Sequence, residues 1–140
     1  MTTPTPFNAY SRYYDLLYQD KDYFAEAAYI HTLLTRNGVA QGNLLEYGSG
    51  TGKHGRLLAQ QGYTVHGIER SADMVAQATV ADGFTCQQGD ICTVQLGRTF
   101  AAVLSLFHVV SYQTSNADLI AVCASAARHL EQNGLFIFDF

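Results

Sequence analysis

The chain has 140 residues, of which 48% are hydrophobic, so it is long enough to form one domain around a buried core. Its formal charge of −4 argues against a nucleic-acid partner bound through a basic surface. No segment has the pattern of a signal peptide or of a membrane span, and the cysteines form no C-x-x-C pair, so we expect free thiols in a reducing cytoplasm.

Residues 1–42 predict a helical lid segment that precedes the main domain. A short helix is expected from residue 8 to about residue 18, because its tyrosines repeat at helical spacing. Tyr10 and Tyr14 either pack on the domain or turn their hydroxyls toward a cofactor or acceptor. A second helix is expected at residues 21–36, where an Asn-Gly pair ends it.

Strand and helix patterns alternate through residues 43–140, which predicts an α/β domain with a doubly wound parallel sheet. We expect strands at 44–47, 63–69, 84–88, 100–107 and 135–140, and helices at 51–61, 71–80 and 117–130. Ligands of such sheets bind beyond the carboxyl ends of the strands. That rule groups the residues that follow each strand: Gly48, Gly50, Gly52, Glu69, Arg70, Asp90, Ile91, Phe107, His108 and Asp139.

The stretch LLEYGSGTGKHG joins the first strand to the next helix, as in a nucleotide-binding turn. A phosphate-binding P-loop is excluded, because two of its required positions carry other residues. The dinucleotide pattern G-x-G-x-x-G is met by Gly50, Gly52 and Gly55, which alone is a weak signal. The S-adenosylmethionine loop, E/D-x-G-x-G-x-G, is met in full by Glu46, Gly48, Gly50 and Gly52.

Several side chains of this neighbourhood have a chemical role to offer. Glu69 can accept hydrogen bonds from both ribose hydroxyls, or it is an ordinary acid before a helix. Asp90 can bind an adenine amino group while the Ile91 N–H donates to a ring nitrogen, or Asp90 is a turn residue that bonds its own backbone. Met74 lies on the adenine face or fills the core, and Glu46 needs a cationic group or N–H donors to offset its burial.

His108 is the best-placed candidate for a general base, because it follows the fourth strand and can titrate near neutrality. Its alternative role is that of a hydrogen-bonded structural histidine. We assign no role to His54, His66 and His129, and no spacing of Cys, His and carboxylate residues predicts a metal site.

Four segments together resemble the class I S-adenosylmethionine-dependent methyltransferases: LLEYGSGTGKHG, HGIERSADM, QQGDI and LFHVVSY. The segment YSRYYDLLY resembles the first helix of the sugar N-methyltransferase and glycine N-methyltransferase type. The resemblance implies a Rossmann-like sheet in the order 3-2-1-4-5 after two N-terminal helices. It also implies S-adenosylmethionine as cofactor, S-adenosylhomocysteine as product, and methyl transfer to an N, O or C atom of a small molecule. Glu46 and the glycines would lie near the amino-acid part of the cofactor, and the backbone of Leu106 and Phe107 near its methionine end.

Two alternatives remain, an NAD(P)-dependent oxidoreductase and a non-catalytic module that binds adenosylmethionine. The oxidoreductase gives Glu46 no role and does not explain the long segment before the first strand. The resembled family continues into two more strands that this sequence lacks, so we expect an N-terminal portion of a longer chain. Residues 135–140 would then form an open apolar edge through which the chain self-associates. We expect a small-molecule acceptor as partner, without nucleic acid or membrane.

Overall fold

The computed structural model describes residues 22–78, 80–106, 109 and 115–139. Among these residues the helices are α2 (Tyr23–Arg36), α3 (Lys53–Gln60), α4 (Ala72–Gln77) and α5 (Asn116–His129). The strands are β1 (Gly42–Tyr47), β2 (Tyr63–Glu69), β3 (Phe84–Gln88), β4 (Phe100–Ser105) and β5 (Leu130–Phe138). The helix expected at residues 8–18, with Tyr10 and Tyr14, lies outside the described residues.

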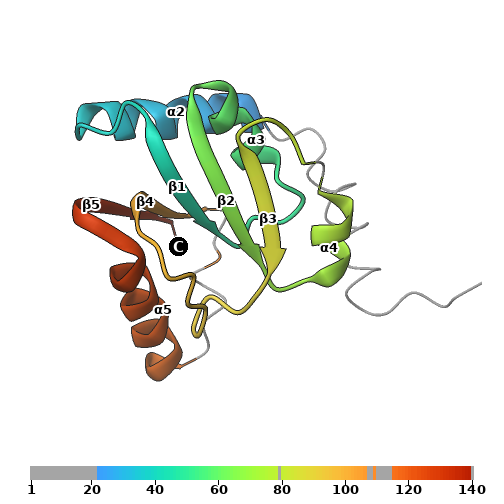
Figure 1. Cartoon of the computed structure of the whole chain (residues 1–140), viewed down its shortest axis with the longest axis vertical. Helices are drawn as coiled ribbons and strands as arrows, with labels where there is room; N and C mark the ends of the chain where they lie inside the picture. Colours follow the sequence, from blue (N-terminus) through green and yellow to red (C-terminus); the bar gives the residue numbers. More distant parts are fainter. Residues whose placement is uncertain (1–21, 79, 107–108, 110–114, 140) are drawn as a thin grey trace, which may run out of the picture.

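The strands form one five-stranded sheet in the order β3-β2-β1-β4-β5, and each neighbouring pair is parallel (Figure 1). This order confirms the prediction of a doubly wound Rossmann-like sheet. The chain runs outward from β1 to β3 and then crosses to β4 on the other side of β1. The connections therefore leave the carboxyl ends of β1 and β4 in opposite directions, which opens a crevice for a ligand between them.

Helices cover both faces of the sheet (Figure 1). On one face, α2 and α3 bury a cluster that includes Leu34, Leu58 and Val65. On the other face, α5 contributes Val122 and Ala126 to a second cluster. Because successive strand residues point to opposite faces, the apolar run of β1 supplies both clusters.

A buried polar network ties α5 to the sheet. The Tyr47 hydroxyl lies 2.6 Å from Ser125 Oγ and 3.3 Å from His129 Nδ1. His129 Nδ1 is 2.7 Å from the Ser125 carbonyl and therefore carries the proton, while Nε2 accepts from the Leu96 N–H at 3.1 Å. The network joins β1, α5 and the irregular segment before β4, and it gives His129 a structural role that the sequence did not indicate.

The buried stripe of α2 consists of Ala27, Ile30 and Leu34, whereas Phe24 near the start of the helix is 66% exposed. His31 borders that stripe, and its Nδ1 lies 2.9 Å from the hydroxyl of Tyr63, which in turn donates to the Val39 carbonyl.

The predicted bounds of β2 and β3 are confirmed, whereas the helices α3 and α4 are shorter than expected. Gly52 has a φ of 85° and caps α3, so the helix begins at Lys53 rather than at residue 51. Ser71 caps α4, since its side chain accepts from the Met74 N–H, and extended backbone at Ala78 ends the helix before residue 80. The strand β4 ends at Ser105, and Phe107 lies outside the described residues.

The largest departure from prediction lies between α5 and β5. The sequence predicted a helix to residue 130 and a strand only from residue 135, yet α5 ends at His129 and β5 begins at once. Leu130 pairs with Phe100 and Leu135 with Ala102, so residues 131–134 bulge from the strand. Asn133, with a φ of 66°, lies in this bulge. The positive φ is therefore needed inside a strand and not at a helix end.

Candidate functional site

The turn between β1 and α3 uses its three alternate glycines in the left-handed conformation. Gly48, Gly50 and Gly52 have φ values of 70°, 58° and 85°. The Gly48 N–H donates to the Ile68 carbonyl at 2.8 Å, which lays the turn across the end of β2. Residues with a Cβ atom are strained in the left-handed conformation. The backbone geometry therefore explains why every second position is a glycine.

These glycines differ in what surrounds them. A Cβ atom on Gly52 would lie 2.7 Å from the Phe84 ring, and one on Gly55 would lie 2.5 Å from it, so α3 needs both glycines to pack on β3. A Cβ on Gly50 would meet only Met74 Sδ, at 3.9 Å. Gly50 therefore has room for a ligand to approach its backbone, whereas packing of α3 on β3 explains the other two glycines of the dinucleotide pattern, Gly52 and Gly55.

Glu69 joins the glycine turn to the start of α4. Its Oε1 accepts from the Gly50 N–H at 2.9 Å, and its Oε2 accepts from the Ser71 N–H at 2.8 Å. A carboxylate offers about four lone-pair positions, so each oxygen retains capacity for a further donor. Met74 is 6% exposed, so it fills the core, and its Sδ lies beside Gly50.

The end of β3 lies next to Glu69, because the Gly89 N–H donates to the Glu69 carbonyl at 3.0 Å. Asp90 is exposed, and its Oδ1 accepts from the Cys92 N–H at 2.8 Å, as in a turn. Ile91 packs against the second core cluster. The exposed Arg70 contributes a backbone carbonyl that accepts from Gln88 Nε2 at 3.1 Å. The strand ends of β1, β2 and β3 thus meet at one place, as the sequence predicted.

Glu46 is a buried carboxyl near the end of β1. It is 2% exposed, and burial, assisted by the charge of Glu69, raises the pKa of its carboxyl to about 8. No described group hydrogen-bonds to Glu46 Oε1 or to Ser49 Oγ, although both atoms are buried. Buried polar atoms are rarely left without partners, so a ligand with hydrogen-bond donors fits this place.

His54, to which the sequence assigned no role, lies beside Glu46. Its Nδ1 lies 4.0 Å from Glu46 Oε2, and its Nε2 lies 3.4 Å from Glu26 Oε1. The sequence could have indicated His54 only by its position, since His54 lies in the first turn of the helix that follows the glycines. Its contact with Glu26 could not be predicted, because α2 brings Glu26 from a distant part of the sequence.

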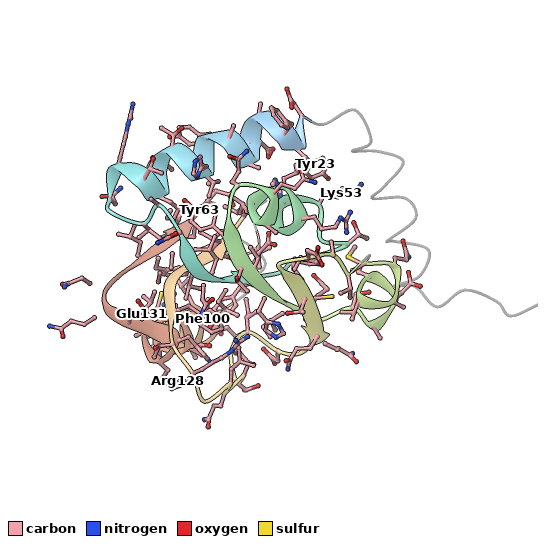
Figure 2. The ribbon with its side chains drawn as sticks, turned by 45° about the horizontal axis from the view of Figure 1, so that its top comes forward. Tyr23, Lys53, Tyr63, Phe100, Arg128 and Glu131 are labelled. Carbon is pink, nitrogen blue, oxygen red and sulfur yellow. The ribbon has the colours of Figure 1, made fainter. Side chains whose placement is uncertain are left out.

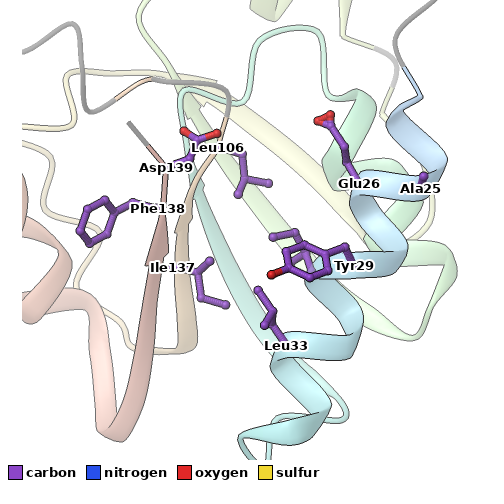
Figure 3. A pocket seen from close by; sticks show the side chains of 9 residues that line it. Ala25, Glu26, Tyr29, Leu33, Leu106, Ile137, Phe138 and Asp139 are labelled. Carbon is purple, nitrogen blue, oxygen red and sulfur yellow. The ribbon is translucent and has the colours of Figure 1, made fainter.

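A cavity of about 490 Å³ opens between α2 and the ends of β4 and β5 (Figure 3). Its wall is mostly apolar and includes Leu106, which was expected at the site. The carboxylates of Glu26 and Asp139 lie at the same end of the cavity in Figure 3. Sequence reasoning missed the contribution of α2, namely Ala25, Tyr29, Ile30 and Leu33. His108, Phe107, Tyr10 and Tyr14 lie outside the described residues.

The three cysteines, Cys86, Cys92 and Cys123, are free thiols. Within the part of the chain that the structure describes, no cluster of three or more His, Cys, Asp or Glu side chains is suited to a metal ion. In the same residues, no helix combines the length and hydropathy needed to cross a bilayer.

The fold and the convergent strand ends are those of a doubly wound α/β domain, and comparison with known proteins identifies its family. Residues 44–134 match a family described as a methyltransferase domain. A dTDP-3-amino-3,4,6-trideoxy-alpha-D-glucopyranose N,N-dimethyltransferase from Streptomyces venezuelae is 37% identical over 130 residues, which are 90% of this chain and 54% of that protein.

Solved structures agree with this match. A sugar N-methyltransferase from Streptoalloteichus has a TM-score of 0.81 and 31% identity, over 90% of this chain and 52% of that one. An amino pentose methyltransferase from Micromonospora echinaspora, solved with bound S-adenosylmethionine, has a TM-score of 0.77 and 30% identity, over 94% and 55%.

The chain therefore belongs to the methyltransferase domain family, and its fold is that of the class I S-adenosylmethionine-dependent methyltransferases. The matches do not favour the oxidoreductase or the non-catalytic module. The chain spans about half the length of the curated relatives it matches.

Proposed function

We propose that the chain binds S-adenosylmethionine at the glycine turn and supports methyl transfer to the amino group of a small molecule. The observation that carries this proposal is the cradle formed by the open Gly50 backbone, by Glu69 and by Glu46, whose Oε1 has no hydrogen-bond partner among the described residues. When bound, S-adenosylmethionine supplies an electrophilic methyl group, and S-adenosylhomocysteine is the product. The protein positions the reactants and excludes water.

Each residue of the cradle has a proposed role. Glu69 holds the ribose, Asp90 and the Ile91 N–H hold the adenine, and Met74 packs against it. Glu46, with the turn of Gly48, Gly50 and Gly52, receives the amino-acid part, while Arg70 flanks the ribose side. The backbone of Leu106 and Phe107 borders the methionine end, and His108 is the candidate base. Tyr10 and Tyr14 cover the cofactor or the acceptor from the lid segment, 1–42.

The acceptor class is inferred from relatives and from the cavity beside α2. Two curated relatives are named as N,N-dimethyltransferases of dTDP-linked amino sugars. Apolar walls with carboxylates at one end suit a molecule that has both an apolar face and an amine (Figure 3). We place the reaction in the cytoplasm, because the thiols are free, and we expect neither nucleic acid nor membrane as partner.

Thermal unfolding in the presence of ligands tests the proposed cofactor. S-adenosylmethionine or S-adenosylhomocysteine at 100 times its Kd should stabilise the fold by about 2.7 kcal/mol, which raises Tm by several degrees. NADH at the same concentration serves as the matched control and should leave Tm unchanged. A shift with NADH alone would contradict the proposed cofactor.

A further inference from the structure

Three titratable side chains lie in a row from the sheet to the surface, and they come from three elements. Glu46 on β1 faces His54 on α3 across 4.0 Å, and His54 faces Glu26 on α2 across 3.4 Å. The side chains of Glu46 and His54 are 2% and 8% exposed, whereas that of Glu26 is 39% exposed. The row thus connects a buried carboxyl of the cofactor cradle to a carboxyl in contact with water.

The contact of His54 with Glu26 favours one position for the imidazole proton. The Glu26 carboxylate only accepts hydrogen bonds, so the proton of a neutral His54 ring belongs on Nε2. Nδ1 then presents a lone pair toward Glu46. Tyr23 packs edge-on against the imidazole with 4.9 Å between the ring centroids, and Lys53 Nζ lies 5.1 Å from the centroid of the same tyrosine (Figure 2). The ring is therefore held in place between α2 and α3.

The surroundings of Glu46 favour a protonated carboxyl in the ligand-free protein. Its carboxyl is buried, its Oε1 has no hydrogen-bond partner among the described residues, and Glu69 on β2 adds a negative charge nearby. These causes raise its pKa to about 8, which favours the protonated carboxyl at pH 7. The β4 residue paired beside Glu46 is Leu104, which has no charge. His54 Nδ1 is thus the base that faces this proton within the described residues.

We propose that His54 accepts the proton of Glu46 when a cationic ligand group binds beside that carboxyl. The O–H bond at Oε2 breaks and an N–H bond forms at Nδ1. This is a proton transfer without oxidation or reduction. The present separation is about 1 Å longer than a hydrogen bond, so the side chains must first approach by a small rotation. Afterwards an imidazolium lies between two carboxylates, which is a favourable order of charges.

This inference rests on the proposed binding of S-adenosylmethionine, whose ammonium group is the cation concerned. It makes His54 a positioning residue, because His54 acts on the cofactor only through Glu46. Binding then leaves the number of protons on the protein unchanged. The affinity at neutral pH should accordingly depend little on pH, even though a protonated carboxyl must ionise.

Nitrogen-15 NMR of the whole chain at pH 7 tests the transfer directly. Titration with S-adenosylmethionine should change His54 from a ring with one protonated nitrogen to an imidazolium with two. Glu46→Gln keeps the size of the side chain but has no proton to give, so His54 should stay neutral in that variant. An unchanged His54 ring in saturated wild-type protein contradicts the proposal.

Calorimetry in buffers of different ionisation enthalpy provides the second readout. Wild-type protein should release close to no protons per bound cofactor, whereas His54→Asn should release about one at pH 7. Below pH 8 the affinity of the His54→Asn variant for S-adenosylmethionine should increase up to tenfold for each unit by which the pH is raised. The reason is that the Glu46 proton must then be released to solvent. Equal proton release by both proteins contradicts the relay.

The two hypotheses fail in different ways. If neither S-adenosylmethionine nor S-adenosylhomocysteine binds the wild-type chain, the proposed function is wrong. If they bind and His54 does not change, the function stands and the proton transfer is wrong. Should His54→Asn not fold, the NMR titration of wild-type and Glu46→Gln proteins still decides the question.

Discussion

In the absence of a ligand, Glu69 links the glycine turn to the start of α4 by hydrogen bonds. Each of its oxygens accepts a backbone N–H, one from the glycine turn and one from the start of α4. The sequence indicated the site of this acid, because it ends a strand at the ligand side of the sheet. It did not indicate the link to Gly50 or the row that joins Glu46 to Glu26. Contacts of this kind depend on how distant segments pack, which no local pattern contains.

Replacing Glu69 by Ala should weaken cofactor binding more than replacing Asp90 by Ala. The first change removes the acceptor proposed for two ribose hydroxyls, and each charge-assisted hydrogen bond contributes roughly 1.5–3 kcal/mol. Asp90 is proposed to accept one. Calorimetric titration of both variants measures the difference, with Glu69→Gln as the matched control that retains the size of the side chain. If the Glu69→Ala variant binds the cofactor with wild-type affinity, Glu69 does not hold the ribose.

At the scale of elements, the sequence predicted strands well where a periodic pattern was bounded by turn residues on both sides, as in β2 and β3. It failed at the junction of α5 and β5. The Asn-Gly pair there signals a positive φ, but that signal does not say which element needs it. Pairing with β4 starts the strand at Leu130 and places Asn133 in a bulge. Tertiary contacts therefore override a local signal that is typical of helix ends.

The packing of α3 on β3 makes Gly52 and Gly50 respond differently to the same change. Gly52→Ala combines a left-handed backbone with a clash against the Phe84 ring and should lower the free energy of unfolding by more than about 2 kcal/mol. Gly50→Ala has the backbone strain alone and should lose about 1 kcal/mol, yet it should weaken S-adenosylmethionine binding. Urea unfolding and ligand titration of the two variants separate stability from binding. Equal destabilisation of both would contradict the packing argument.

At the scale of the molecule, the sheet ends in two edge strands, β3 and β5. The outer strand β5 is rich in apolar side chains, and Phe138 is 45% exposed. Natural edges usually carry charges, prolines or bulges in their exposed part. The bulge of β5 lies at its start, so it does not guard the segment from Leu135 to Phe138.

We expect the 140-residue chain to self-associate through β5 in solution. Light scattering should show a mass above that of a monomer that rises with concentration. Phe138→Lys places a charge on the edge and should shift the protein toward monomer, while Val80→Lys, an exposed apolar position outside the sheet, should not. A monodisperse wild-type monomer at high concentration would show that the edge is tolerated.

The hydrogen bond from Leu96 to His129 has a consequence for amide exchange. Leu96 belongs to no helix or strand, and such amides ordinarily exchange with solvent deuterium quickly. Its N–H is nevertheless held by a ring that is 2% exposed and anchored to Ser125 and Tyr47. It should therefore exchange about as slowly as the amides of β1. Fast exchange at Leu96 in a protein whose β1 stays protected would show that α5 has left the sheet while the rest of the domain remains folded.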